Sequence, residues 1–243
     1  MADFKTHITV STLVGVGYGA AGFYYGASLE SSMLAAGLCS VSGILPDLDS
    51  DSGIPYRESV AFIAAFVPMA LVQRFEHLGW DRETIVLAAA LIYIAVRFVM
   101  ADIFRRYTVH RGMWHSIPAA VSVGLVTFLI ADDKDLLLRA YWSGAAVSGF
   151  LVHLVLDEIY SVDFRGVRLK KSFGTALKFW SARGWWPNIS TYGKLAILAS
   201  LAWGDPKLTA YMEQHHPNAA RTARQVQQTV APSSDAADSI LRR

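Results

Sequence analysis

The chain has 243 residues, of which 53% are hydrophobic and 17% are charged, and its mean hydropathy is +0.32. Because a soluble domain carries about 25% charged residues, this composition excludes a disordered chain and argues against an ordinary soluble enzyme. The formal charge of +2 is too balanced to indicate a nucleic-acid partner, and the single cysteine, Cys39, excludes an internal disulfide and a cysteine-based metal site.

Six apolar segments predict an all-α, polytopic membrane protein. A bilayer core about 30 Å thick needs about 20 helical residues, and Ile8–Leu29 supplies 22 residues without a charge. Shorter segments still span if they tilt or if their polar residues face the bundle interior. Five glycines in the first segment suit close contact between helices in lipid: Gly15, Gly17, Gly19, Gly22 and Gly26. The expected membrane-embedded helices are residues 8–29, 31–46, 58–73, 84–104, 116–131 and 140–160.

The distribution of basic residues predicts the orientation of these helices. Twelve Lys and Arg fall on the side that holds residues 1–7, 47–57, 105–115 and 161–194, whereas the other side holds four. Basic residues stay on the cytoplasmic side of a membrane, so we expect the first side to face the cytoplasm of a bacterial inner membrane. Seven of the twelve lie between residues 165 and 194, so the orientation depends mainly on that stretch.

Two further segments follow the membrane-embedded domain, which we place at residues 1–160. Residues 161–204 combine basic with aromatic residues, which is typical of a segment at the lipid headgroup surface; a solvated connector is the alternative. This segment ends in a short apolar helix, 192–203, that is too short to span. Residues 205–243 are polar and predict a partly helical, then disordered tail without catalytic residues.

Four clusters of polar residues interrupt this apolar chain, and all four fall on the predicted cytoplasmic side. Since the spans follow from hydrophobicity alone, this agreement supports the topology. The clusters are His7; Asp47, Asp49 and Asp51; His110 and His115; and His153 with Asp157.

His153 and Asp157 are the strongest pair. Residues four apart lie one above the other on a helix face, so the two side chains can share a metal ion, or the carboxylate can orient the imidazole. The alternative is a His–Asp hydrogen bond that joins helices. Burying ionisable groups in a membrane is costly and usually functional, which favours the metal interpretation.

The other clusters fit the same chemistry. His110 and His115 are five apart and need a bend to converge, which Gly112 supplies, while Ser116 caps the next helix with Pro118 in its first turn. A basic juxtamembrane loop with incidental histidines is the alternative.

The aspartate run suits divalent cations, but Ser52 replaces the glycine that a calcium-binding loop requires. Arg106 and Arg111 can bind a phosphate or act as cytoplasmic anchors. Glu158 is a candidate ligand or base, although it points about 100° away from Asp157 on a helix.

Together these motifs resemble the membrane-bound metal-dependent hydrolase family, the YdjM-like, LexA-regulated inner-membrane proteins. The resemblance covers roughly residues 1–160 and rests on His7, Gly43-Ile-Leu-Pro-Asp-Leu-Asp49, His110-Arg-Gly-Met-Trp-His-Ser116 and His153-Leu-Val-Leu-Asp157. Family members commonly have Thr where this chain has Trp114. The family is also remotely similar to the all-helical zinc phospholipase C and P1 nuclease group, whose sites end in a His-xxx-Glu/Asp pair and cleave phosphodiesters.

The residues and the resemblance together lead to one functional hypothesis. We expect an enzyme, a metal-dependent hydrolase at the cytoplasmic face of the bilayer, that cleaves a phosphoester, with a lipid among the possible substrates. One or more divalent ions, most simply zinc, are expected on His7, Asp47, Asp49, His110, His115, His153 and Asp157. Asp49 or Asp51 is the expected general base.

Two other classes of function remain open. An ion- or proton-coupled transporter would place these residues near the bilayer midplane, and a non-catalytic scaffold would enclose its metal completely. The sequence indicates no oligomeric state.

Overall fold

The protein is described here by a computed structural model. It describes residues 3–49, 60–61, 64–65, 67–69, 71–72, 75–76, 78–100, 113–131, 135–163, 168–169, 174, 176–182 and 184–215. The chain divides into two compact units, residues 1–198 and 199–243.

The first two helices form an antiparallel hairpin at the N-terminus. Helix α1 (Phe4–Tyr24) begins after Asp3, whose carboxylate accepts hydrogen bonds from the Thr6 amide at 2.9 Å and from the Thr6 hydroxyl. These bonds favour the ionised carboxylate and hold the pKa of Asp3 below its usual range. Gly26, with φ of +98°, ends the helix, and Ser28 caps α2 (Leu29–Ser42) through the Ser31 amide.

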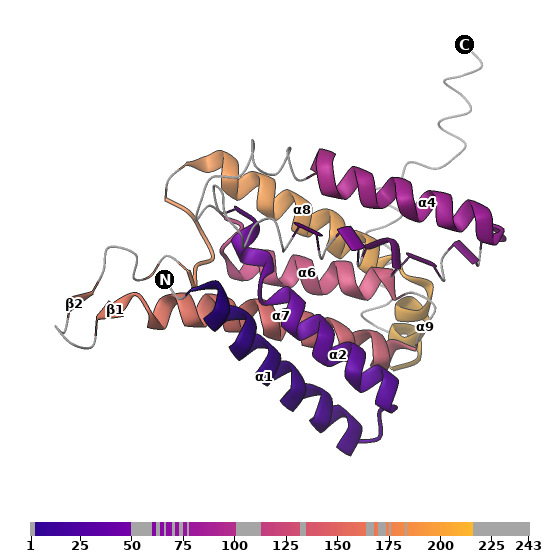
Figure 1. The fold of residues 1–243 in the computed structure, drawn as a ribbon, viewed down its shortest axis with the longest axis horizontal. Helices are drawn as coiled ribbons and strands as arrows, with labels where there is room; N and C mark the ends of the chain where they lie inside the picture. The colour runs from indigo at the N-terminus through magenta and orange to yellow at the C-terminus, as the bar shows by residue number, and fades with distance from the viewer. Residues whose placement is uncertain are drawn as a thin grey trace, which may run out of the picture. The chain divides into compact units, whose positions relative to one another are not determined.

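A second antiparallel hairpin joins α6 (Ile117–Ile130) to α7 (Leu136–Ile159). Ser116 caps α6 by accepting from the Ala119 amide at 3.4 Å, and Pro118 lies in the first turn, which confirms the expected helix start. Asp135 caps α7 through the Leu138 amide at 2.8 Å. Helix α7 contacts α1, α2 and α6, so it forms the centre of this part of the fold (Figure 1).

Hydrogen bonds from aromatic side chains join the packed helices. Tyr18 of α1 and Tyr141 of α7 stack at 5.1 Å, and each hydroxyl donates to the other residue's carbonyl oxygen, at 2.9 and 3.4 Å. The Trp142 indole donates to the Ser31 carbonyl at 3.2 Å. Tyr18 lies beside Tyr141 and His7 beside Asp157, so α1 is antiparallel to α7. Ser31 lies beside Trp142 and Cys39 beside Gly149, so α2 is parallel to α7. The ends of α2 and α7 therefore lie beside the start of α1.

Glycines allow the close approach of these helices. A Cβ at Gly15 or Gly19 would meet a carbonyl oxygen of α2, and a Cβ at Gly149 would overlap Cys39 and Ser42 of the same helix. The expected role of glycine in helix contact is therefore present at Gly15 and Gly19, and at Gly22, where a Cβ would overlap Tyr141. It is absent at Gly17 and Gly26, where a Cβ would have no described neighbour within 4 Å.

The remaining elements differ from the expected boundaries. A 3₁₀ segment, η1 (Leu45–Asp49), follows α2, and a π-helical segment, η2 (Ala95–Met100), follows α4 (Arg82–Ile94). Two short strands, β1 (Val162–Asp163) and β2 (Arg168–Leu169), pair antiparallel with Val162 opposite Leu169. Helix α8 (Trp185–Trp203) begins seven residues before the expected helix at 192, inside the expected surface segment.

In the second unit, helix α9 (Pro206–His215) lies at the start of the expected tail. Its cap is Asp205, which accepts from the amides of Lys207 and Leu208 at 3.0 Å each. The expected disorder beyond this helix concerns residues 216–243, which lie outside the described residues.

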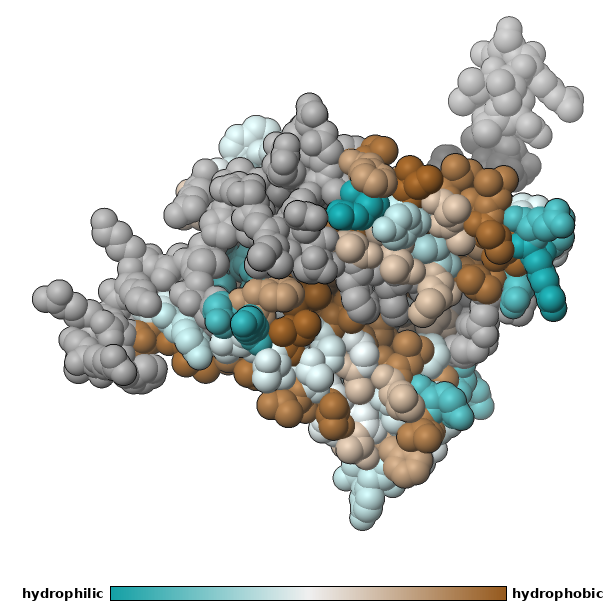
Figure 2. All heavy atoms as spheres, viewed as in Figure 1, coloured by the Kyte–Doolittle hydropathy of each residue, from teal (hydrophilic) through white to brown (hydrophobic). Residues whose placement is uncertain are grey.

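The surface has the apolar character expected of a chain in a membrane. Within the described residues, the continuous helical stretch Leu29–Asp47 is long and apolar enough to cross a bilayer, and Ile117–Ile130 is a shorter apolar helix. The expected class, all-helical, is confirmed apart from the β1–β2 pair, whereas the expected six spans are not established by these lengths. Large apolar side chains are nevertheless exposed along α4, including Val86 at 68% and Leu87 at 61%, and Figure 2 shows hydrophobic residues over this helix.

Candidate metal centre

The candidate site lies where four separate segments meet. His7 is in the first turn of α1, Asp47 is in η1, and His115 lies in the turn before α6, while His153 and Asp157 are near the end of α7. Two helices begin and two end at this place, because the hairpins alternate in direction. The fold therefore brings together five residues that are up to 150 positions apart in sequence.

Asp157 is the centre of the cluster. Its Oδ1 lies 3.3 Å from Nε2 of His7, and its Oδ2 lies 3.9 Å from Nε2 of His153 and 4.0 Å from Nε2 of His115. On the other side of the cluster, Oδ1 of Asp47 lies 3.6 Å from Nε2 of His153. Ligand atoms around one zinc ion, each at about 2.0–2.2 Å from it, lie about 3–4 Å apart, so these separations match a shared ion.

The backbone determines which nitrogen of His153 is available. Its Nδ1 lies 2.7 Å from the carbonyl oxygen of Gly43, and since a carbonyl only accepts, Nδ1 carries the proton and Nε2 keeps its lone pair. Metal-binding histidines commonly have this arrangement, in which the ring nitrogen that does not bind the metal donates a hydrogen bond to a fixed oxygen. A Cβ on Gly43 would overlap the Ser11 side chain, so glycine lets α2 end close enough to hold this ring.

The cluster is buried and its donor atoms are poorly satisfied. His7, His115, His153 and Asp157 are each at most 2% exposed, and the His7 and His153 rings stack at 3.6 Å. In the part of the chain that the structure describes, Nε2 of His153 and both carboxylate oxygens of Asp157 make no hydrogen bond. Buried polar atoms without partners are costly, and a cation between them would satisfy all three at once.

Two overlapping groups of ligand atoms result. One consists of His7, Asp47 and His153, the other of His115, His153 and Asp157, and within each the atoms lie within 4.8 Å of one another. The Asp47 side chain is 15% exposed, so water has access to the cluster from the η1 side.

The remaining predicted site residues cannot be placed in this geometry. Residues Asp51, His110, Arg106 and Arg111 lie outside the described residues, as does the side chain of Asp49, whose backbone ends η1. Glu158 does not face the cluster. Its carboxylate accepts hydrogen bonds from the amides of Gly174 and Ala176, the latter at 3.3 Å, and so joins the segment after the strands to the end of α7.

Trp114 has a structural role that the sequence did not indicate, since the sequence shows only that it replaces the Thr common in the family pattern. Its indole nitrogen donates to the Leu45 carbonyl at 2.9 Å, and its ring meets Phe150 edge-on at 6.1 Å. It thereby ties the turn that carries His115 to the segment that carries Asp47. The sequence shows Trp114 next to the candidate ligand His115. It does not show the hydrogen-bond partner, Leu45, which is 69 residues earlier in the chain.

Comparison with known proteins identifies the family. The family model of the YdjM inner membrane protein matches residues 1–205. The chain belongs to this family. The match extends past residue 160, where the sequence motifs end, so it includes the segment that carries β1 and β2 and all of α8. No curated protein and no solved structure matches the chain.

Membership agrees with the exposed apolar surface described above. Exposed apolar side chains such as those on α4 are expected of an inner membrane protein.

Proposed function

We propose that this YdjM-family protein is a polytopic, metal-dependent hydrolase that acts on a phosphoester at the cytoplasmic face of the inner membrane. The observation that supports it is the buried cluster of three imidazoles and two carboxylates, in which Nε2 of His153 and both oxygens of Asp157 have no hydrogen-bond partner among the described residues. Such a set of nitrogen and oxygen donors favours zinc among divalent ions.

The proposed ligands extend beyond the five that meet in the structure. His7, Asp47, His115, His153 and Asp157 hold one or more ions, and Asp49 and His110 complete the set because their neighbours in sequence, Asp47 and His115, already lie in the cluster. Bound zinc would lower the pKa of a coordinated water and polarise a phosphoryl oxygen.

The chain's own residues have three further tasks in this proposal. Asp49 or Asp51 accepts a proton from the attacking water, since both lie within four residues of the ligand Asp47 in sequence and the Asp47 side chain is partly exposed. Arg106 and Arg111 bind the phosphate, because a guanidinium offers paired donors to two phosphate oxygens. The Gly43 carbonyl accepts a hydrogen bond from His153 and so orients its imidazole.

The position of the cluster supports hydrolysis over transport. Transporters bind substrate near the bilayer midplane, whereas every described member of this cluster lies within the last or first turns of its helix or just outside it. In the six-span topology that we propose, the chemistry would lie at headgroup level, where lipid phosphoesters are present.

The test is the metal content of the purified protein. We expect wild-type protein in detergent to hold near-stoichiometric divalent metal by elemental mass spectrometry, and His153→Ala to lose most of it, since this side chain belongs to both ligand groups. His215→Ala, a histidine of α9 whose ring contacts Tyr211, is the matched control and should keep the metal.

Circular dichroism must show that all three proteins are equally helical. Equal metal in wild type and His153→Ala, or none in wild type after reloading with zinc, manganese and iron, would overturn the proposal. If the protein binds metal but cleaves no phosphoester in a panel of lipids and model phosphodiesters, it is a metal-binding scaffold and not a hydrolase.

A further inference from the structure

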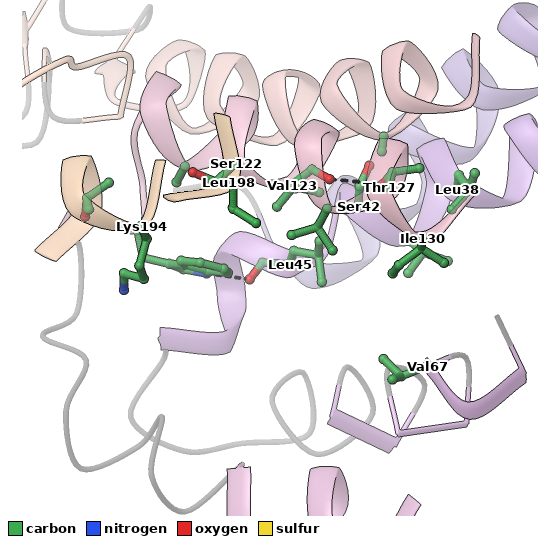
Figure 3. A pocket seen from close by; sticks show the side chains of 16 residues that line it. Leu38, Ser42, Leu45, Val67, Ser122, Val123, Thr127, Ile130, Lys194 and Leu198 are labelled. Carbon is green, nitrogen blue, oxygen red and sulfur yellow. Dashed lines mark hydrogen bonds between the residues drawn. The ribbon is translucent and has the colours of Figure 1, made fainter. Parts of the chain in front are cut away.

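Beside the metal centre lies an apolar cavity that the proposed hydrolysis does not by itself explain. Its volume is about 330 Å³, within the usual range for ligand pockets and roughly twice that of a cavity that holds benzene, so it has room for about a dozen carbon atoms. Helices α2, α6, α7 and α8 all contribute to its wall (Figure 3). Its described lining is Leu38, Val41, Ser42, Leu45, Val67, Trp114, Ala119, Ser122, Val123, Val126, Thr127, Ile130, Ala146, Thr191, Lys194 and Leu198.

The lining is more apolar than its residue types indicate. Three of its four hydroxyl side chains donate to carbonyl oxygens of their own helices: Ser42 to Cys39 at 3.2 Å, Ser122 to Pro118 at 2.9 Å and Thr127 to Val123 at 3.0 Å. Because their hydroxyl protons are used in these hydrogen bonds, the three side chains present mainly methyl and methylene groups to a bound molecule.

The cavity has one charged group, and it lies at one end. Among the described lining residues, Lys194 alone carries a charge, and its side chain is exposed. Figure 3 shows Lys194 at one end, Leu38 and Ile130 at the other, and Leu45 and Val123 between them. From Ala119 to Ile130 the lining follows α6 over eleven residues, which is about 16 Å. This is close to half of a bilayer core about 30 Å thick, the depth that one acyl chain fills.

The cavity and the metal centre share a wall. Leu45 and Trp114 both line the cavity and are joined by the indole hydrogen bond. Asp47 follows two residues after Leu45 in the same 3₁₀ segment, and His115 follows Trp114 directly.

We propose that the cavity binds one acyl chain of an anionic phospholipid, with its phosphate at Lys194 and the end of the chain between Leu38 and Ile130. Three features point to this occupant: the apolar lining, the length of half a bilayer, and one cation at one end of the cavity. The inference rests on the proposed function only for the hydrolysis of the phosphoester, because binding of the acyl chain needs neither metal nor turnover. It specifies the substrate class of that site as a membrane phospholipid.

The test measures lipid binding directly, by native mass spectrometry of the full chain in detergent. The probes are didodecanoyl phosphatidic acid, whose chains match the room for about a dozen carbon atoms, didodecanoylglycerol, which lacks the phosphate, and inorganic phosphate, which lacks the acyl chains. We expect one phosphatidic acid per protein chain, weaker binding of didodecanoylglycerol, and no competition by inorganic phosphate. Competition by phosphate at equal concentration would show that the ligand is a free anion and would overturn the proposal.

Two variants distinguish binding of the acyl chain from binding of the headgroup. Val123→Trp fills the middle of the cavity and should weaken both lipids about tenfold or more, since excluding two methylenes already has that effect. Val86→Trp, on the exposed face of α4, is its control and should change neither. Lys194→Gln should weaken binding of phosphatidic acid up to about fivefold and leave binding of didodecanoylglycerol unchanged. Equal binding by Val123→Trp and Val86→Trp would overturn the assignment of the cavity, and an unchanged preference for phosphatidic acid in Lys194→Gln would overturn that of the headgroup.

A measurement on the wild-type protein tests the proposal even if a variant fails to fold. Phosphatidic acid with a photoreactive diazirine at the end of its acyl chain should label α2 or α6 near Leu38 and Ile130. Labelling confined to α4 would mean that lipid contacts only the outer surface, and would overturn the proposal. The metal measurement is independent, so lipid binding without metal refutes only the proposed function, and metal without lipid binding refutes only this inference.

Discussion

At the scale of single residues, the properties of the site depend on two hydrogen bonds that backbone carbonyls accept. Gly43 accepts from His153 and so leaves Nε2 of that ring for the cluster. Leu45 accepts from Trp114 and so holds η1, with Asp47, against the turn that carries His115. Neither partner is visible as a motif, because carbonyl oxygens are present at every position in the sequence.

Trp114→Phe tests the second of these bonds. The variant keeps the ring beside Phe150 and removes the donor, which should cost about 1–3 kcal/mol of stability and weaken metal binding, because η1 loses its link to the His115 turn. Thermal unfolding and metal titration in detergent provide the two measurements.

Trp142→Phe is the matched control, since it removes an indole hydrogen bond to Ser31 near the start of α2 and α7, at the end away from the cluster. It should lower stability by a similar amount and leave metal affinity unchanged. A loss of metal affinity in both variants would mean that general destabilisation, and not the position of η1, is the cause.

At the scale of helices, close packing against α7 determines where the ligands meet. Gly149 lies one turn before His153, and its missing side chain makes room for Cys39 and Ser42 of α2. The end of α2 can then approach His153, and η1 places Asp47 within 3.6 Å of that ring.

Gly149→Ala should therefore push α2 away from α7. We expect a loss of several kcal/mol, roughly that of an overpacked core, together with reduced metal binding. Gly17→Ala, in open space on α1, should be neutral or slightly stabilising because alanine is the better helix former. Thermal unfolding of both variants checks this, and equal stabilities would contradict the close packing of α2 and α7 at this position.

At the scale of the whole molecule, the remaining question is which side of the membrane carries the site. The family match establishes an inner membrane protein, and the excess of basic residues predicts that the ends that carry the metal ligands face the cytoplasm.

Cysteine labelling measures this orientation. Cys39 is fully buried, so Cys39→Ala provides a background without reactive thiols. Leu78→Cys, in the loop expected on the outer side, should react with a membrane-impermeant maleimide in spheroplasts, and Leu177→Cys should react only after permeabilisation. Both residues are exposed. The reverse pattern would place the metal centre outside the cytoplasm and remove the cytoplasmic part of the proposal.

The sequence by itself determined the helical class and the candidate ligands. Long apolar segments have few alternatives to helix in lipid, and ionisable residues among them are conspicuous because they are costly there. The start of α6 followed from Ser116 and Pro118, which are local signals. Helix ends were less predictable: α8 begins at Trp185, where composition alone indicated a surface segment.

Only the tertiary structure decided how the ligands combine. It showed that His7, Asp47, His115, His153 and Asp157 share one buried cluster, and that Glu158 instead binds the amides of Gly174 and Ala176. It also revealed the acyl-sized cavity, whose wall draws on four helices. These features depend on contacts between residues far apart in the chain, and such contacts are determined by the packing of small residues such as Gly43 and Gly149 and not by any local pattern.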